Sequence, residues 1–149
     1  PVEAGGVAAF TKWGPFYEEY TAEVPTLVLN GKIFALCGIY DFVRVFPKNI
    51  LARKLFEDGV ETIKKILPQY DMGFWSRYNL CKASWYPKVD PSTIQYQKLH
   101  VTQLKMLCRL TSEQVFSFYA QKFQKQLTYF NAVRMYFVKF KALKKLGRL

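Results

Sequence analysis

The sequence predicts a mainly α-helical fold built from helical hairpins, with short β-hairpin insertions. Apolar residues recur at helical spacing over most of the chain after residue 27. A segment that is apolar almost all round is followed by an amphipathic one, and apolar inner helices surrounded by amphipathic outer helices are typical of an α/α toroid. The chain has room for about five such helices, which would make only part of such a ring. We therefore expect part of an α/α toroid.

The first expected element is a β-hairpin over residues 5–20. Apolar residues from Val7 to Phe10 favour an extended strand, and residues 12–15, Lys-Trp-Gly-Pro, have the composition of a turn. Extended structure resumes at Phe16. The pattern predicts two short antiparallel strands.

Two helices of different character are expected next. Residues 27–45 are apolar almost all round, which predicts a helix buried on most sides, and Pro25 is placed to open it. The pair Asn30-Gly31 favours a hairpin instead, but the apolar run is too long for one strand. Residues 51–67 alternate apolar and charged residues at helical spacing and predict an amphipathic helix that ends at Pro68.

A strand and a third helix are expected after it. Residues 74–81 are rich in aromatic residues and predict a strand. After a loop rich in Pro and Asp, Ser92 or Thr93 can cap a third helix, whose leucines continue at helical spacing to Leu110.

Residues 111–149 predict a basic helical extension. Thr111 and Glu113 belong to a segment with capping-box spacing for a fourth helix, and residues 115–146 predict one long helix or two. The 149-residue chain has 22 Lys and Arg against 11 Asp and Glu, a formal charge of +11, and its last acidic residue is Glu113. Such an imbalance attracts nucleic acid, acidic polysaccharide or an anionic membrane surface. The alternative interpretation is a solvated basic face that only keeps the chain soluble.

The sequence does not favour a metal site or a disulfide framework. Its three cysteines, Cys37, Cys81 and Cys108, are widely spaced and contain no CxxC pair, and it has a single histidine. No apolar run reaches the length of a membrane span, and no signal-peptide pattern precedes the first expected strand. Since the chain opens at Pro1, we take it to be an excerpt or a processed form, and its compartment stays undetermined.

Tyrosines are the most suggestive polar residues. Tyr20 follows the first hairpin, Tyr78 lies in the expected strand, and Tyr96 begins the third helix, where His100 shares its face at i+4. Taken singly, each tyrosine is more simply interpreted as a core residue whose hydroxyl is satisfied.

Taken together, these segments resemble the C-terminal helical domain of the D-glucuronyl C5-epimerase family. The resemblance covers residues 5–110 in the family's order, and only a general helical likeness continues beyond Glu113. We therefore interpret residues 1–149 as a single domain of this kind. The segments that carry the resemblance are Tyr17-Glu18-Glu19-Tyr20, Pro25, Val28 to Gly31, Gly38 to Asp41, Leu67 to Asp71, Tyr78-Asn79-Leu80, and Tyr96 with His100 to Leu104.

The resemblance implies an isomerase that inverts C5 of glucuronic acid units in a heparosan-like polysaccharide, without an organic cofactor. Removing the C5 hydrogen, which neighbours a carboxylate, requires a base on one face of the sugar and an acid on the other. It also requires positive charge or hydrogen-bond donors at the carboxylate. The resemblance assigns proton transfer to Tyr78 and Tyr96, with Glu19 and Tyr20 positioning the substrate or sharing that work.

The chain departs from the family where the substrate carboxylate is expected. The family's Tyr-Asp-Leu-Arg stands here as Tyr78-Asn79-Leu80-Cys81, so the arginine is missing. Arg77 and Lys98 are candidate replacements, as is Lys82, although Arg77 is expected on the opposite side of the strand from Tyr78. Asn30 and His100 complete the predicted substrate-binding set, and His100 either positions Tyr96 or is an ordinary core histidine.

Three functions remain in view. The leading one is an epimerase-like domain that acts on an acidic polysaccharide. The second, favoured by Cys81 in place of the arginine, is a non-catalytic module that binds acidic glycans. Nucleic-acid binding through the basic C-terminal helix is the least favoured, since no nucleic-acid fold signature is present. The apolar final helix can pack against a missing portion of the protein or against a second subunit, so a homodimer stays open.

Overall fold

The computed structural model describes residues 1–148, and the final residue of the predicted 111–149 extension lies outside that range. Within it the chain is mainly helical, with one small two-stranded sheet, as the sequence predicts. The elements are η1 (Val2–Ala4), β1 (Ala8–Thr11), β2 (Gly14–Tyr17), α1 (Leu29–Val45), α2 (Ile50–Ile66), η2 (Leu67–Tyr70), α3 (Ile94–Thr111), α4 (Gln114–Lys125) and α5 (Tyr129–Lys145).

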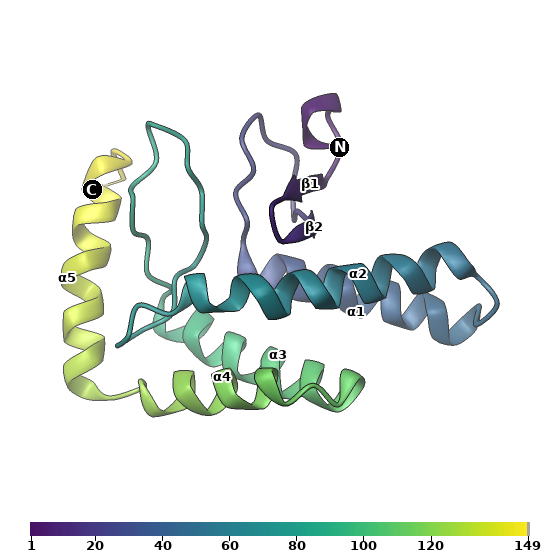
Figure 1. The fold of residues 1–149 in the computed structure, drawn as a ribbon. Helices are drawn as coiled ribbons and strands as arrows, with labels where there is room; N and C mark the ends of the chain where they lie inside the picture. The colour runs from purple at the N-terminus through teal and green to yellow at the C-terminus, as the bar shows by residue number, and fades with distance from the viewer. Residues whose placement is uncertain (149) are drawn as a thin grey trace.

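The helices form two hairpins and one separate helix. Helices α1 and α2 pack against each other, α3 and α4 form a second pair next to them, and α5 runs across one end of both pairs (Figure 1). Two long connections, residues 18–28 and 71–93, extend beyond the helices on the side that carries the β-hairpin. These connections lie between the β-hairpin and α5, and they carry Glu19, Tyr20, Arg77 and Tyr78 of the predicted site.

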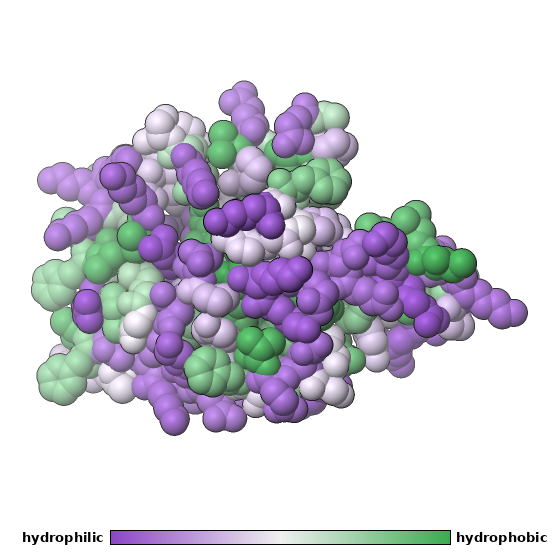
Figure 2. All heavy atoms as spheres, in the orientation of Figure 1, coloured by the Kyte–Doolittle hydropathy of each residue, from purple (hydrophilic) through white to green (hydrophobic). Residues whose placement is uncertain are grey.

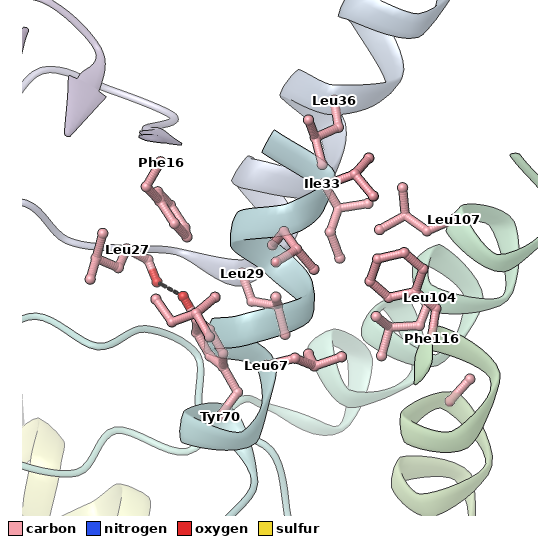
Figure 3. Close-up of a cluster of buried hydrophobic side chains, with 14 of the residues drawn as sticks. Phe16, Leu27, Leu29, Ile33, Leu36, Leu67, Tyr70, Leu104, Leu107 and Phe116 are labelled. Carbon is pink, nitrogen blue, oxygen red and sulfur yellow. Dashed lines mark hydrogen bonds between the residues drawn. The ribbon is translucent and has the colours of Figure 1, made fainter. Parts of the chain in front are cut away.

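The main core lies where the two helical hairpins meet. A second, smaller cluster is formed by Phe74 and Trp75 with Met135 of α5. In the main core, Tyr70 donates a hydrogen bond of 2.6 Å to the carbonyl of Leu27, which ties the end of η2 to the approach of α1 (Figure 3). The fully buried residues of the main core include Phe16, Leu29, Ile33, Leu36, Ile63, Ile66, Leu67, Tyr70, Leu104, Leu107, Phe116 and Phe123.

Helix α1 differs from the prediction in two ways. It begins at Leu29 and not near Pro25, and its buried residues all lie between Leu29 and Leu36. The second half extends with α2 beyond the α3–α4 pair (Figure 1), so its apolar side chains have little to pack against. Phe42 and Val45 are exposed there, and apolar residues gather at that end of the surface (Figure 2). Burial on most sides is therefore wrong for the second half of the helix.

The predicted β-hairpin is confirmed and is held on the helices by a buried lysine. Strands β1 and β2 are antiparallel, with Ala8 opposite Tyr17. Lys32 of α1 is fully buried, and its Nζ donates to the carbonyl of Pro15 at 3.0 Å and lies 3.5 Å from the Tyr17 ring centroid. Burial lowers the pKa of Lys32 to about 7, against the opposing effect of Glu18.

The strand predicted over residues 74–81 does not form. The segment makes only isolated bridges, Asp71 with Ser76 and Arg77 with Pro91. Aromatic residues favour a strand in general, but here Phe74 and Trp75 pack into the cluster beneath α5, so no continuous ladder is built.

The helix ends give mixed results. Thr93 caps α3, and its side chain accepts a hydrogen bond from the Tyr96 N–H. Thr93 is one of the two capping residues that the sequence predicted. The capping box at Thr111 is wrong, because Thr111 is still part of α3, and Ser112 ends that helix in a left-handed conformation. The predicted helical region 115–146 forms two helices, α4 and α5. A short turn separates them, and Thr128 caps the start of α5.

Candidate active site

The backbone of Tyr78 is held between the first turn of α1 and the approach to α3. Its N–H donates to the carbonyl of Asp90 at 2.8 Å, and its carbonyl accepts from the N–H of Leu29 at 3.3 Å. The next contact, from Leu80 N–H to the Thr26 carbonyl, continues the same pairing. Residues 26–29, 78–80 and 90–92 therefore run side by side at the start of both helices.

Tyr78 and Tyr96 are in direct contact. Their ring centroids lie 5.0 Å apart with an interplanar angle of 69°, an edge-to-face arrangement. Tyr96 occupies the first turn of α3, where the Thr93 cap fixes its backbone at 3.3 Å. Both rings are half-buried, so each remains accessible to a ligand.

Glu19 lies against the first turn of α1. A Cβ added at Gly31 would come within 2.7 Å of the Glu19 Cβ, so only glycine allows this approach. The adjacent Glu18 turns inward and accepts from the N–H of Leu27 at 3.0 Å. Consecutive glutamates thus have different roles: Glu18 secures the loop, and Glu19 remains exposed.

The four predicted catalytic residues form one electrostatic group. Burial raises the pKa of Tyr78 far above its usual range, and Tyr96, then Glu19, then Tyr20 raise it further. A tyrosine that acts as a base near neutral pH needs a lowered pKa, which a neighbouring cation would provide. The structure gives the opposite direction for Tyr78, which therefore holds its proton at neutral pH.

The sequence did not single out Lys139 of α5, which lies next to this group. Its Nζ is 5.8 Å from the Tyr78 ring centroid and forms a salt bridge of 2.6 Å with Asp90. The same Nζ donates to the Pro91 carbonyl at 3.1 Å. The lysines of α5 give no sign in the sequence that one of them pairs with Asp90, which lies 49 residues away from Lys139.

His100 and Asn30 are buried behind the tyrosines. His100 is fully buried, its Nδ1 lies 2.8 Å from the Ser76 hydroxyl, and burial lowers its pKa to about 3. The carbonyl of Asn30 accepts from the side-chain amide of Gln103 at 3.1 Å. Within residues 1–148, the Asn30 Oδ1, the Gln103 Oε1 and the His100 Nε2 have no hydrogen-bond partner. The hydrogen bond to Ser76 is the kind that a core histidine makes.

The two remaining predicted residues lie apart from the tyrosine pair. Arg77 lines a pocket of about 900 Å³ while the adjacent Tyr78 packs on Tyr96, so the two side chains point to different sides, as predicted. Cys81 also lines that pocket. Lys98 is exposed on α3, and residues two apart on a helix do not share a face.

Two further observations concern the described part of the chain only. No group of three His, Cys, Asp or Glu side chains in residues 1–148 is arranged to hold a metal ion. None of the helices in that range combines the length and the apolar character needed to cross a membrane.

The fold and site define a helical domain with two tyrosines in contact at the start of α3, and comparison with known proteins names its family. A family model described as "D-glucuronyl C5-epimerase C-terminus" matches residues 1–125. The chain belongs to this family, as its motifs predicted. Helix α5, which supplies Lys139, lies beyond the matched residues.

Two relatives fit this assignment. An uncharacterized protein of Methanocaldococcus jannaschii is 32% identical over 128 residues, which cover 83% of this chain and 39% of that protein. The D-glucuronyl C5-epimerase of Caenorhabditis elegans is 28% identical over 124 residues, which cover 76% of this chain and 20% of that protein. The chain thus spans well under half the length of both relatives.

Proposed function

We propose that this chain forms part of the active site of a uronyl C5-epimerase that inverts glucuronic acid units in a heparosan-like acidic polysaccharide. The five helices would then be part of an α/α toroid. The observation that carries the proposal is the contact between Tyr78 and Tyr96, with Glu19 and Tyr20 in the same electrostatic group. Family membership also supports it.

The reaction needs two groups that exchange protons with one carbon. The C5–H bond breaks, its electron pair enters the carboxylate as an enolate, and a proton from the opposite face forms the new C5–H bond. No bond to an organic cofactor is required. Two half-buried tyrosines in contact can serve as the pair, provided that one begins as the phenol, which donates its proton, and the other as the phenolate, which accepts the proton from C5.

The pKa shift distinguishes their roles. Because burial and its neighbours raise the pKa of Tyr78, this residue retains its proton and is suited to donate it to the sugar. The acceptor role for glucuronic acid units then falls to Tyr96. In the reverse direction, from iduronic acid units, the two tyrosines exchange roles by microscopic reversibility.

The proposal is tested by following deuterium at C5 by NMR with the full-length parent protein. The substrates are heparosan, its N-sulfated form and a polyuronate without amino sugars, each in heavy water. We expect deuterium at C5 of heparosan or its N-sulfated form, together with new iduronic acid signals. A folded parent protein that introduces no deuterium into any of the polymers would contradict the proposal.

A second function has one specific observation in its favour. Cys81 stands where the family motif has arginine and is buried at the wall of the pocket that Arg77 also lines, so the arginine's positive charge is absent from this position. A non-catalytic module that binds acidic glycans would tolerate this change. It predicts saturable binding of heparosan in the same experiment, without exchange at C5.

A further inference from the structure

A pocket beside Arg77 is separate from the tyrosine pair. It has a volume of about 900 Å³, near the upper end of the range for small-molecule sites, roughly 300–1,000 Å³. Its walls come from the β1–β2 turn, the approach to α1, segment 71–93 and the end of α5. Neither Tyr78 nor Tyr96 is among its lining residues.

The charge of this pocket is entirely positive. Its ionised lining groups are cationic, and no Asp or Glu lines it. None of these cations forms an ion pair with a carboxylate within residues 1–148; Lys145 and Arg77 donate only to backbone carbonyls there. Uncompensated charges around a concave, weakly hydrated surface reinforce one another at an anion. The five cations are Lys12, Arg77, Lys82, Lys88 and Lys145.

The walls between these charges are apolar. Trp13, Pro25 and Leu80 line the pocket, and Trp13 is half-buried. A sugar ring with a carboxylate or sulfate group presents apolar C–H faces beside one concentrated negative charge. Apolar walls with cations at the edge match both parts of such a unit.

Arg77 is the most directed group in the pocket. Its Nη1 donates to the Lys88 carbonyl at 3.3 Å, and its Nε is buried without a partner among the described residues. A guanidinium group offers parallel donors that match carboxylate or sulfate oxygens, whereas lysine acts as a point charge. Since Arg77 directly precedes Tyr78, a chain bound in the pocket would pass close to the tyrosine pair.

We propose that this pocket is a second binding site, which takes an anionic sugar unit of the polymer a few units away from the one that reacts. The identity of the polymer rests on the proposed function; the preference for a carboxylate or sulfate group rests on the pocket itself. The site holds the polymer in register but takes no part in proton transfer.

The test uses the full-length parent protein with Lys12 and Lys88 both replaced by alanine. Both lysines are exposed, so the double variant should fold. The matched control removes the same charge from exposed residues of α3 and α4, as Lys105→Ala with Lys125→Ala. Affinity for a heparosan octasaccharide is measured by isothermal titration calorimetry at several salt concentrations, and inversion is measured by NMR.

We expect the pocket variant to bind at least about tenfold more weakly, since it loses two contacts to a charged group. Its affinity should also depend less steeply on salt, because fewer charges are neutralised on binding. The control should bind like the parent protein. Inversion by the pocket variant should show a raised KM and a parental kcat. Equal affinity of the pocket variant and the parent would overturn the proposal.

The outcomes separate this proposal from the proposed function. If the parent binds but does not exchange at C5, and the pocket variant binds weakly, the pocket proposal stands and the epimerase proposal fails. If the parent inverts the polymer and the pocket variant binds as tightly, only the pocket proposal fails. Titration of the N-sulfated octasaccharide shows whether sulfate or carboxylate is preferred. A single-stranded oligonucleotide that binds more tightly than both would overturn the assignment to a sugar.

Discussion

The two sides of segment 71–93 have opposite chemical character, although Arg77 and Tyr78 are neighbours in the chain. On one side, two half-buried phenol rings meet beside a carboxylate, and the pKa of Tyr78 is raised by burial. On the other side, cations without carboxylate partners in the described chain line a pocket of about 900 Å³. Desolvation shifts the pKa of a group and so controls when it gives up its proton, whereas an exposed cation attracts an anion. The comparison indicates that one segment separates proton transfer from polymer binding.

The largest expected effect comes from removing either hydroxyl of the tyrosine pair. Tyr78→Phe and Tyr96→Phe should each lower the rate of inversion by about 10²–10⁴, the usual loss for a general acid or base. Both rings stay in place, so binding of the octasaccharide should change little. Tyr136→Phe, on the exposed face of α5, is the control and should keep the parental rate. If folded Tyr78→Phe or Tyr96→Phe inverts the polymer at the parental rate, proton transfer does not take place at this tyrosine pair.

The next largest effect concerns the salt bridge between Lys139 and Asp90, which holds α5 against segment 71–93. Asp90 is 5% exposed, so Lys139→Ala leaves a buried carboxylate without its cation. We expect a loss of about 3–5 kcal/mol in the free energy of unfolding, measured in urea. Lys141→Ala, exposed on the same helix and in no ion pair within residues 1–148, should stay within about 0.5 kcal/mol of the parent. Similar losses in both variants would show that α5 does not anchor the segment.

A smaller effect is expected from acid, through the buried histidine behind the tyrosines. His100 has a pKa of about 3 in the folded chain, below the value near 6.5 of an unfolded chain. Below about pH 6.5 the unfolded state therefore binds a proton that the folded state excludes, and stability falls until about pH 3. By pH 5 the loss is about 2 kcal/mol. His100→Gln should flatten this part of the stability curve; an unchanged slope between pH 6.5 and 5 would contradict the assignment.

The smallest effect compares two helix caps. Thr93 and Thr128 each accept a hydrogen bond of 3.3 Å from a backbone N–H in the first turn of their helices. Replacing either by alanine should cost about 1 kcal/mol in thermal unfolding. Only Thr93→Ala should also lower kcat, because the Thr93 hydroxyl accepts its hydrogen bond from the N–H of Tyr96. Equal kinetic effects would show that the cap does not position the tyrosine.

The helices and the first hairpin could be predicted because their signals are local. Turn residues 12–15 and the period of the apolar residues are sufficient without knowledge of the fold. The exposed second half of α1 could not be predicted, since its burial depends on how far α3 and α4 reach. The strand predicted at residues 74–81 failed for a related reason, since its aromatic residues pack under α5 instead of building a ladder.

The candidate site was predicted in part. The resemblance placed Glu19, Tyr20, Tyr78 and Tyr96 in one group, although no periodicity relates residues so far apart, and the structure brings them together. Lys139 and the basic pocket were missed because their parts come from separate regions of the chain. Charged residues that meet only after folding leave no local pattern in the sequence.

The most direct test of the central claim follows deuterium uptake at C5 by Tyr78→Phe and Tyr96→Phe, starting separately from glucuronic acid and iduronic acid units. With one tyrosine left, inversion should fall by about 10²–10⁴ while exchange continues from one epimer only. Tyr78→Phe should still exchange glucuronic acid units, and Tyr96→Phe only iduronic acid units. Parental inversion by both folded variants, or unchanged exchange from both epimers, would contradict the assignment of proton transfer to this pair.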